Sequence, residues 1–222
     1  MHNGFAIALA WPETQCKQAG TWYDFPLYYL GINKMGFYKV GHSALVLVDD
    51  ERASCRYFDF GRYHAPPGFG RVRSQETDHD LEIRTRANIS STCKEICNLE
   101  EILSELYKNA STHGTGTIFG ATTRINCTEA LKFIFQLQER EHIPYGPFIQ
   151  NGTNCSRFVN SAIRAGNSVL SKSIRLILAP MFTPTPKWNL KALGGNIRSI
   201  GTANMGTVSA TINPKHELKS AS

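Results

Sequence analysis

The chain has 222 residues, 41% of them hydrophobic, and a formal net charge of +6. This length and composition allow one substantial core and give no sign of a second, so we expect a single domain over residues 1–222, with a polar tail that frays from about residue 213. No apolar run reaches the roughly 20 residues that a membrane span needs, and six cysteines are too few for a disulfide scaffold, so reduced thiols are expected.

The chain begins with a predicted strand. Residues 5–11 read F-A-I-A-L-A-W, and the residues before them carry no basic segment of the kind that opens a signal peptide. We therefore expect a cytoplasmic protein, and export by another route stays open.

A β-hairpin follows. Residues 41–48 read G-H-S-A-L-V-L-V, which predicts a buried strand entered by His42. The polar cluster at residues 49–52 turns the chain, and residues 55–60, C-R-Y-F-D-F, return as a second strand. The pattern thus places a histidine at the start of an interior strand.

The hairpin nominates a partner for this histidine. If the turn centres between residues 50 and 51, His42 lies directly opposite Asp59, with the two Cβ atoms roughly 5 Å apart on one face. Asp59 would then orient the imidazole. A shift of one residue in the turn centre would place Gly61 opposite His42 instead. His64, which follows the same strand, is the competing candidate for the orienting residue.

The middle of the chain is more helical. Residues 71–86 are polar with at most a short strand, whereas residues 98–106 begin with a capping-box pattern and residues 128–139 have helical apolar spacing. These elements predict an α+β fold in which helices pack on one side of an antiparallel sheet. Cys93 and Cys97 have i, i+4 spacing, but no further ligands are suitably placed, so we expect no metal and no cofactor.

Residues 143–160, I-P-Y-G-P-F-I-Q-N-G-T-N-C-S-R-F-V-N, are the most informative segment. Thr153 or Asn154 can cap a helix that begins at Cys155, and Gly166 can end it. Its apolar face would comprise Phe158, Val159, Ala162 and Ile163. At the first turn of a helix, unpaired N–H groups and the macrodipole favour a thiolate over a thiol, and the thiolate is the nucleophile. This pattern is typical of thiol enzymes, although a buried free cysteine can also be purely structural.

Two short blocks, residues 41–63 and 143–166, resemble a known superfamily. The Tyr-Gly turn, the Gly-Thr-Asn-Cys-Ser and the following Phe-Val look like the nucleophile segment of NlpC-type cysteine peptidases. In those enzymes the cysteine precedes the histidine. The reverse order here is similar to the circularly permuted papain-like branch, which includes lecithin:retinol acyltransferase-like proteins, permuted deSUMOylating isopeptidases and bacterial permuted NlpC-like hydrolases. The resemblance implies a permuted papain-like fold.

The resemblance also implies roles for individual residues. Cys155 matches the nucleophile, His42 the base and Asp59 the third polar residue, which varies among branches. Tyr145 matches a tyrosine that lines the site, where it is a candidate oxyanion donor. Asn154, the second candidate for contacting substrate, stands where those peptidases usually have an aspartate that meets a substrate amine.

The resemblance implies a cysteine hydrolase acting on a peptide, glycopeptide or acyl substrate. The alternatives are a thiol acyltransferase on the same scaffold and a non-catalytic binding module with a basic C-terminal surface. Basic residues gather late in the chain, but they are scattered and match no nucleic-acid-binding motif, so no specific nucleic acid is expected. The oligomeric state stays open. These basic residues are Arg157, Arg164, Lys172, Arg175, Lys187, Lys191, Arg198, Lys215 and Lys219.

Overall fold

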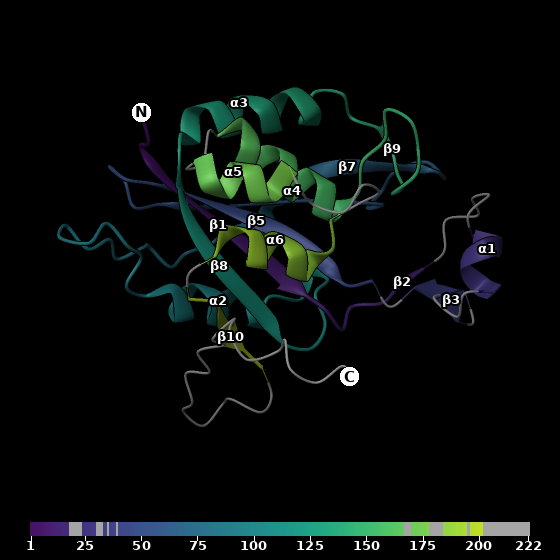
Figure 1. The fold of residues 1–222 in the computed structure, drawn as a ribbon, viewed down its shortest axis with the longest axis horizontal. Helices are drawn as coiled ribbons and strands as arrows, with labels where there is room; N and C mark the ends of the chain where they lie inside the picture. Colours follow the sequence, from purple (N-terminus) through teal and green to yellow (C-terminus); the bar gives the residue numbers. More distant parts are fainter. Residues whose placement is uncertain are drawn as a thin grey trace.

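The computed structural model describes residues 1–17, 24–29, 33–34, 36–38, 40–166, 170–177, 184–194 and 196–201. The tail that is expected to fray lies outside these residues. Within them the fold is α+β, as the sequence predicts, with a large antiparallel sheet and several helices (Figure 1). None of the described helices is long and apolar enough to cross a membrane.

The large sheet has seven strands in the order β10-β8-β1-β5-β6-β7-β9. Neighbouring strands all run antiparallel. The predicted N-terminal strand, β1, lies in the interior of the sheet and pairs with β5 and β8. The strands are β1 (Gly4–Trp11), β5 (His42–Asp49), β6 (Cys55–Gly61), β7 (Phe69–Ser74), β8 (Ile118–Ile125), β9 (Ile143–Pro144) and β10 (Arg198–Ile200).

A small three-stranded sheet, in the order β2-β4-β3, is inserted between β1 and β5 in the chain. It lies to one side of the large sheet together with a short helix (Figure 1). The Tyr38 hydroxyl donates a hydrogen bond to the Asp24 carboxylate and thereby ties the small sheet to this helix. The elements are β2 (Cys16–Lys17), α1 (Asp24–Tyr29), β3 (Asn33–Lys34) and β4 (Phe37–Tyr38).

β1 contributes to two cores at once, because successive side chains of a strand point to opposite faces of the sheet. All of its residues are buried. Its large side chains, Phe5, Ile7, Leu9 and Trp11, belong to one core, and its small ones, Ala6, Ala8 and Ala10, belong to the other. The alanines leave room for α6 (Pro186–Leu193) to pack directly on β1.

Helices cover both faces of the large sheet, so the expectation of helices on one side is wrong. On one face, with α6, lie α3 (Cys127–Gln138), α4 (Cys155–Ala165) and α5 (Leu170–Ile177) (Figure 1). On the other, α2 (Leu99–Lys108) packs through Leu99, Ile102, Leu103 and Leu106, near two single-turn 3₁₀ helices, His79–Leu81 and Ala110–Thr112. The helical periodicity identifies α2 and α3 but does not say which face each one covers.

The hairpin of β5 and β6 forms as predicted, but its register differs. Ala44, and not His42, lies opposite Asp59. In this register the position across from His42 is that of Gly61, so the predicted direct pairing of His42 with Asp59 is wrong.

The turn between β5 and β6 explains the difference. The Asp49 side chain accepts hydrogen bonds of 2.9 Å from the backbone N–H groups of Glu51 and Arg52. Ala53 takes a left-handed conformation with φ of 52°. Turns that are stabilised by side-chain hydrogen bonds can be longer than a simple two-residue turn. Here the turn centre lies one residue later than predicted, which changes each predicted pair by two residues.

Candidate active site

Cys155 is the first residue of α4, as the sequence predicts. The Asn154 side chain caps the helix by accepting a 2.9 Å hydrogen bond from the Arg157 backbone N–H, and Gly166 forms the C-cap. The predicted apolar face is buried against the sheet, which fixes the helix in place. Cys155 itself is only 6% exposed, at a helix end that favours negative charge.

His42 begins β5 and is held by the strand beside it. It lies opposite Trp11 in β1, and the two rings stack with centroids 5.7 Å apart. The preceding residue, Gly41, has a φ of 77°, and a Cβ there would lie 3.0 Å from the Trp11 carbonyl oxygen, so this turn requires glycine. The His42 imidazole is buried, and it lies close enough to the Cys155 sulfur for each group to shift the pKa of the other. The structure therefore brings together two residues that are far apart in the sequence.

A second contact ties the same two elements together. Ser43 Oγ and Ser156 Oγ, each next to one of these residues, are buried and lie 3.1 Å apart. The Ser156 carbonyl in turn accepts a 2.8 Å hydrogen bond from Asn189 of α6. No sequence pattern indicates this link, because it depends on how α4 lies across β5.

Asp59 still faces His42 despite the altered register. The pairing moves by two residues, and because side chains alternate with a period of two, Asp59 stays on the His42 face. His42 Nε2 lies 3.5 Å from Asp59 Oδ2, which is longer than a well-formed hydrogen bond. His64, the competing candidate, is exposed, in the loop after β6.

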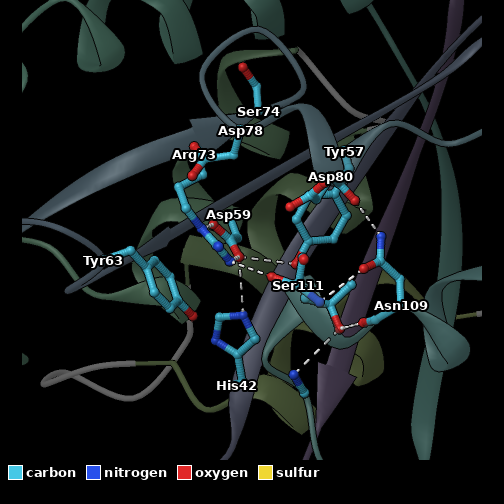
Figure 2. Close-up of polar contacts among 12 residues, drawn as sticks. His42, Tyr57, Asp59, Tyr63, Arg73, Ser74, Asp78, Asp80, Asn109 and Ser111 are labelled. Carbon is cyan, nitrogen blue, oxygen red and sulfur yellow. Dashed lines mark hydrogen bonds and ion pairs between the residues drawn. The ribbon is translucent and has the colours of Figure 1, made fainter.

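Arg73 is the polar residue of this site that the sequence does not indicate. It lies opposite Asp59 on β7, and its Nε and Nη2 donate to the two Asp59 carboxylate oxygens at 2.9 and 2.6 Å. Figure 2 shows its guanidinium between Tyr63 and Asp59, with His42 on the far side of the carboxylate. The Tyr57 hydroxyl also donates to Asp59, at 3.0 Å. Asp59 is thus a shared acceptor, bound more tightly by Arg73 than by His42.

Arg56 and Arg62, which are closer to Asp59 in the sequence than Arg73 is, make other contacts. Arg56 pairs with Glu76 on the surface. The strand that carries Arg73 reads F-G-R-V-R-S, which is too polar to predict a buried arginine. Only the pairing of β6 with β7 identifies the contact.

The charges of the three groups depend on one another. Burial opposes a charged imidazole, but the Asp59 carboxylate and the Cys155 sulfur outweigh it and raise the pKa of His42 to about 9. Burial also opposes a thiolate, yet His42 and the Ser43 backbone lower the pKa of Cys155 below its ordinary value. Burial opposes an ionised Asp59, but His42 and Arg73 lower its pKa as well. The site favours a thiolate and an imidazolium, with an ionised carboxylate behind them.

Replacing Arg73 with methionine is expected to destabilise the fold, because Asp59 would lose its main partner inside the protein. Breaking a buried pair in this way costs about 3–5 kcal/mol. Arg71→Met is the matched control: Arg71 makes the same two-pronged pair with Asp78, at 2.7 and 2.9 Å, but that pair is partly exposed and is worth about 1 kcal/mol or less. Urea unfolding measures both. Equal losses would contradict the buried-pair interpretation.

Tyr145 and Asn154 both lie at the cleft. They line the same pocket as Cys155, and Tyr145 also lines the adjoining pocket that contains His42. The Tyr145 ring stacks on Phe60 with centroids 5.8 Å apart. Burial and the Cys155 sulfur raise the pKa of Tyr145 well above its ordinary value, so its hydroxyl stays protonated and able to donate. The roles predicted for the two residues in binding substrate stay predictions.

Cys93 and Cys97 lie in the irregular segment before α2, and both are exposed. Their i, i+4 spacing is typical of a helix, but these two cysteines are not on one. Among the described residues, no three histidine, cysteine or acidic side chains lie close enough together to hold a metal ion.

The family model described as type VI secretion system effector TseH-like matches residues 6–171. A solved structure, the crystal structure of the type VI secretion system effector TseH, has a TM-score of 0.58 and 20% identity, and covers 94% of this chain and 99% of its own. At that identity it shows a shared fold. No curated protein matches the chain. Because the family model spans well over half of the sequence, the chain belongs to the TseH-like family of type VI secretion system effectors.

Proposed function

We propose that the protein is a cysteine hydrolase of the amidase or peptidase type on a permuted papain-like scaffold. The observation that supports this most is the placement of buried Cys155, at the start of α4, next to buried His42, at the start of β5, where their neighbours Ser156 and Ser43 lie 3.1 Å apart. The order along the chain, histidine on an early strand and cysteine on a late helix, supports the permuted arrangement.

Acylation begins with the thiolate. Cys155 Sγ attacks the carbonyl carbon of an amide, and a C–S bond forms while the carbonyl oxygen becomes an oxyanion. The Cys155 backbone N–H lacks an intrahelical partner at the first turn and is one candidate donor to this oxygen; the Tyr145 hydroxyl is the second. The C–N bond then breaks, and the imidazolium of His42 gives its proton to the leaving amine.

Deacylation reverses the proton movement. His42, now neutral, takes a proton from water, and the resulting hydroxide attacks the thioester carbonyl. The C–S bond breaks and the acid product leaves, so the Cys155 thiolate and the His42 imidazolium are restored together. With Nε2 facing Asp59, Nδ1 is the nitrogen available to the thiol. Asp59 would hold this orientation, and Arg73 would hold Asp59.

The family membership bears on where this chemistry takes place. A type VI secretion system effector is a delivered protein, so we propose a substrate outside the producing cell. This proposal replaces the expectation of a cytoplasmic protein, which no feature of the described residues tests.

The pH dependence of Cys155 tests the proposed function. Cys155 is expected to react with iodoacetamide near neutral pH far faster than the other five cysteines, because only the thiolate reacts and its pKa is lowered. Turnover should fall above about pH 9, where His42 loses the proton needed by the leaving group. In His42→Ala, the midpoint for alkylation should rise toward the ordinary value. If all six thiols react at the same rate, the proposed hydrolase function is wrong.

A further inference from the structure

The cleft at the candidate site consists of two pockets. One, with a volume of about 210 Å³, is lined by His42, and the other, of about 150 Å³, is lined by Cys155. Cys16 and Tyr145 line both and therefore stand at the boundary between them. The two reacting side chains thus open onto different compartments.

The compartments differ in chemistry. The walls of the Cys155 pocket are largely apolar, formed by Tyr38, Val40, Pro147, Pro184 and Pro186, with Lys17 as the one charged side chain among the described residues of its lining. The His42 pocket is more polar, because Gln15, Arg62 and His113 line it beside aromatic side chains. None of the described residues that line either pocket is an aspartate or a glutamate. The described part of the cleft therefore offers no carboxylate to a substrate amine.

Arg62 lines the His42 pocket. Its guanidinium carbon is 5.2 Å from the centroid of the Tyr145 ring, and its Nη2 donates to the Lys17 carbonyl oxygen. These contacts hold a permanent positive charge in the wall of the His42 pocket. An arginine in such a position is well suited to a carboxylate.

The chemistry of acyl transfer indicates which part of the substrate occupies each pocket. In acyl transfer to a thiol, the acyl part of the substrate stays on sulfur, and the part that receives the proton departs. Cys155 bears the acyl group and His42 supplies the proton. The acyl part therefore occupies the Cys155 pocket, and the leaving group occupies the His42 pocket.

From these observations we infer the substrate class: an amide whose acyl part carries a small apolar group and whose leaving amine carries a carboxylate held by Arg62. This inference rests on the proposed function. It predicts that the site prefers a leaving amine that carries a carboxylate. A leaving group with a second, positively charged amine in place of the carboxylate should be rejected.

Protection of Cys155 from iodoacetamide measures this preference without an identified substrate. N-acetyl-valyl-alanine is expected to protect at a concentration about tenfold or more below that of its C-terminal amide, because a charged hydrogen bond would be lost with the amide. Arg62→Gln should remove the difference. Arg140→Gln, which removes the same charge from an exposed position just after α3, should keep the difference. N-acetyl-aspartyl-alanine should protect at least about tenfold less well than the valyl peptide.

The outcomes separate the two proposals. If Cys155 reacts no faster than the other cysteines, the proposed function fails and this inference fails with it. If Cys155 reacts rapidly but the acid and amide peptides protect equally, or neither protects, only the inference is overturned. A preference that persists in Arg62→Gln, or stronger protection by the aspartyl peptide, would overturn it as well.

Discussion

Replacing Cys155 with alanine is expected to abolish turnover and the rapid phase of alkylation while the fold persists. Loss of a covalent nucleophile lowers kcat by roughly 10⁶ in enzymes of this kind. The substitution removes a single sulfur atom beside a cleft, so the free energy of unfolding should change by about 1 kcal/mol or less. Alkylation kinetics with mass spectrometry, together with urea unfolding, measure both effects.

Cys127 provides the matched control. It is also buried, but burial raises the pKa of its thiol to about 12, so it should be unreactive near neutral pH. Cys127→Ala should therefore keep the rapid phase, although it removes a core side chain. A rapid phase that survives in Cys155→Ala and maps to another cysteine would show that the nucleophile is misassigned.

Replacing Asp59 with asparagine is expected to have two large effects. Turnover should fall by up to about 10⁴, the scale for losing the residue that orients a catalytic histidine. Stability should fall by about 3 kcal/mol as well, because Arg73 would be left buried without its charge partner. The pKa of Asp59 is lowered, so this stabilisation is present at neutral pH and is lost as the pH falls below the ordinary value of 3.8. From the sequence of the hairpin alone, Asp59→Asn would be expected to keep its stability. The buried ion pair with Arg73 is the reason to expect a loss.

A double variant separates the two effects of Asp59. Replacing a buried ion pair with apolar residues of similar size is often neutral for stability, so Asp59→Leu combined with Arg73→Met should regain much of the lost stability. Turnover should stay low, because His42 still lacks its carboxylate. Recovery of both would mean that Asp59 acts only in folding. His64→Ala should change neither, since His64 is exposed in the loop after β6.

The sequence predicts the parts of the site that depend on local signals. The cap at Asn154 and the apolar face after Cys155 specify where α4 begins and what it buries. The run of apolar residues after His42 specifies β5. Both signals are encoded within about ten neighbouring residues, so tertiary contacts do not alter them.

The sequence does not predict the parts that depend on pairing between distant elements. The register of β5 with β6 is set by the hydrogen bonds of Asp49 in the turn, and Arg73 reaches Asp59 only because β7 pairs with β6. Likewise, the apolar face of α2 says that the helix is buried but not on which side of the sheet. Alternation along the strands preserved the contact of His42 with Asp59 even though the predicted register was wrong.

The ultraviolet absorbance of the Cys155 thiolate reports whether Cys155 and His42 form a thiolate–imidazolium pair. The difference in absorbance between the native protein and Cys155→Ala, followed across pH, reports the ionisation of this one thiol. We predict a midpoint below the ordinary value of 9, moved upward in His42→Ala. A midpoint at or above 9 in the native protein, unchanged in His42→Ala, would show that the two residues form no such pair.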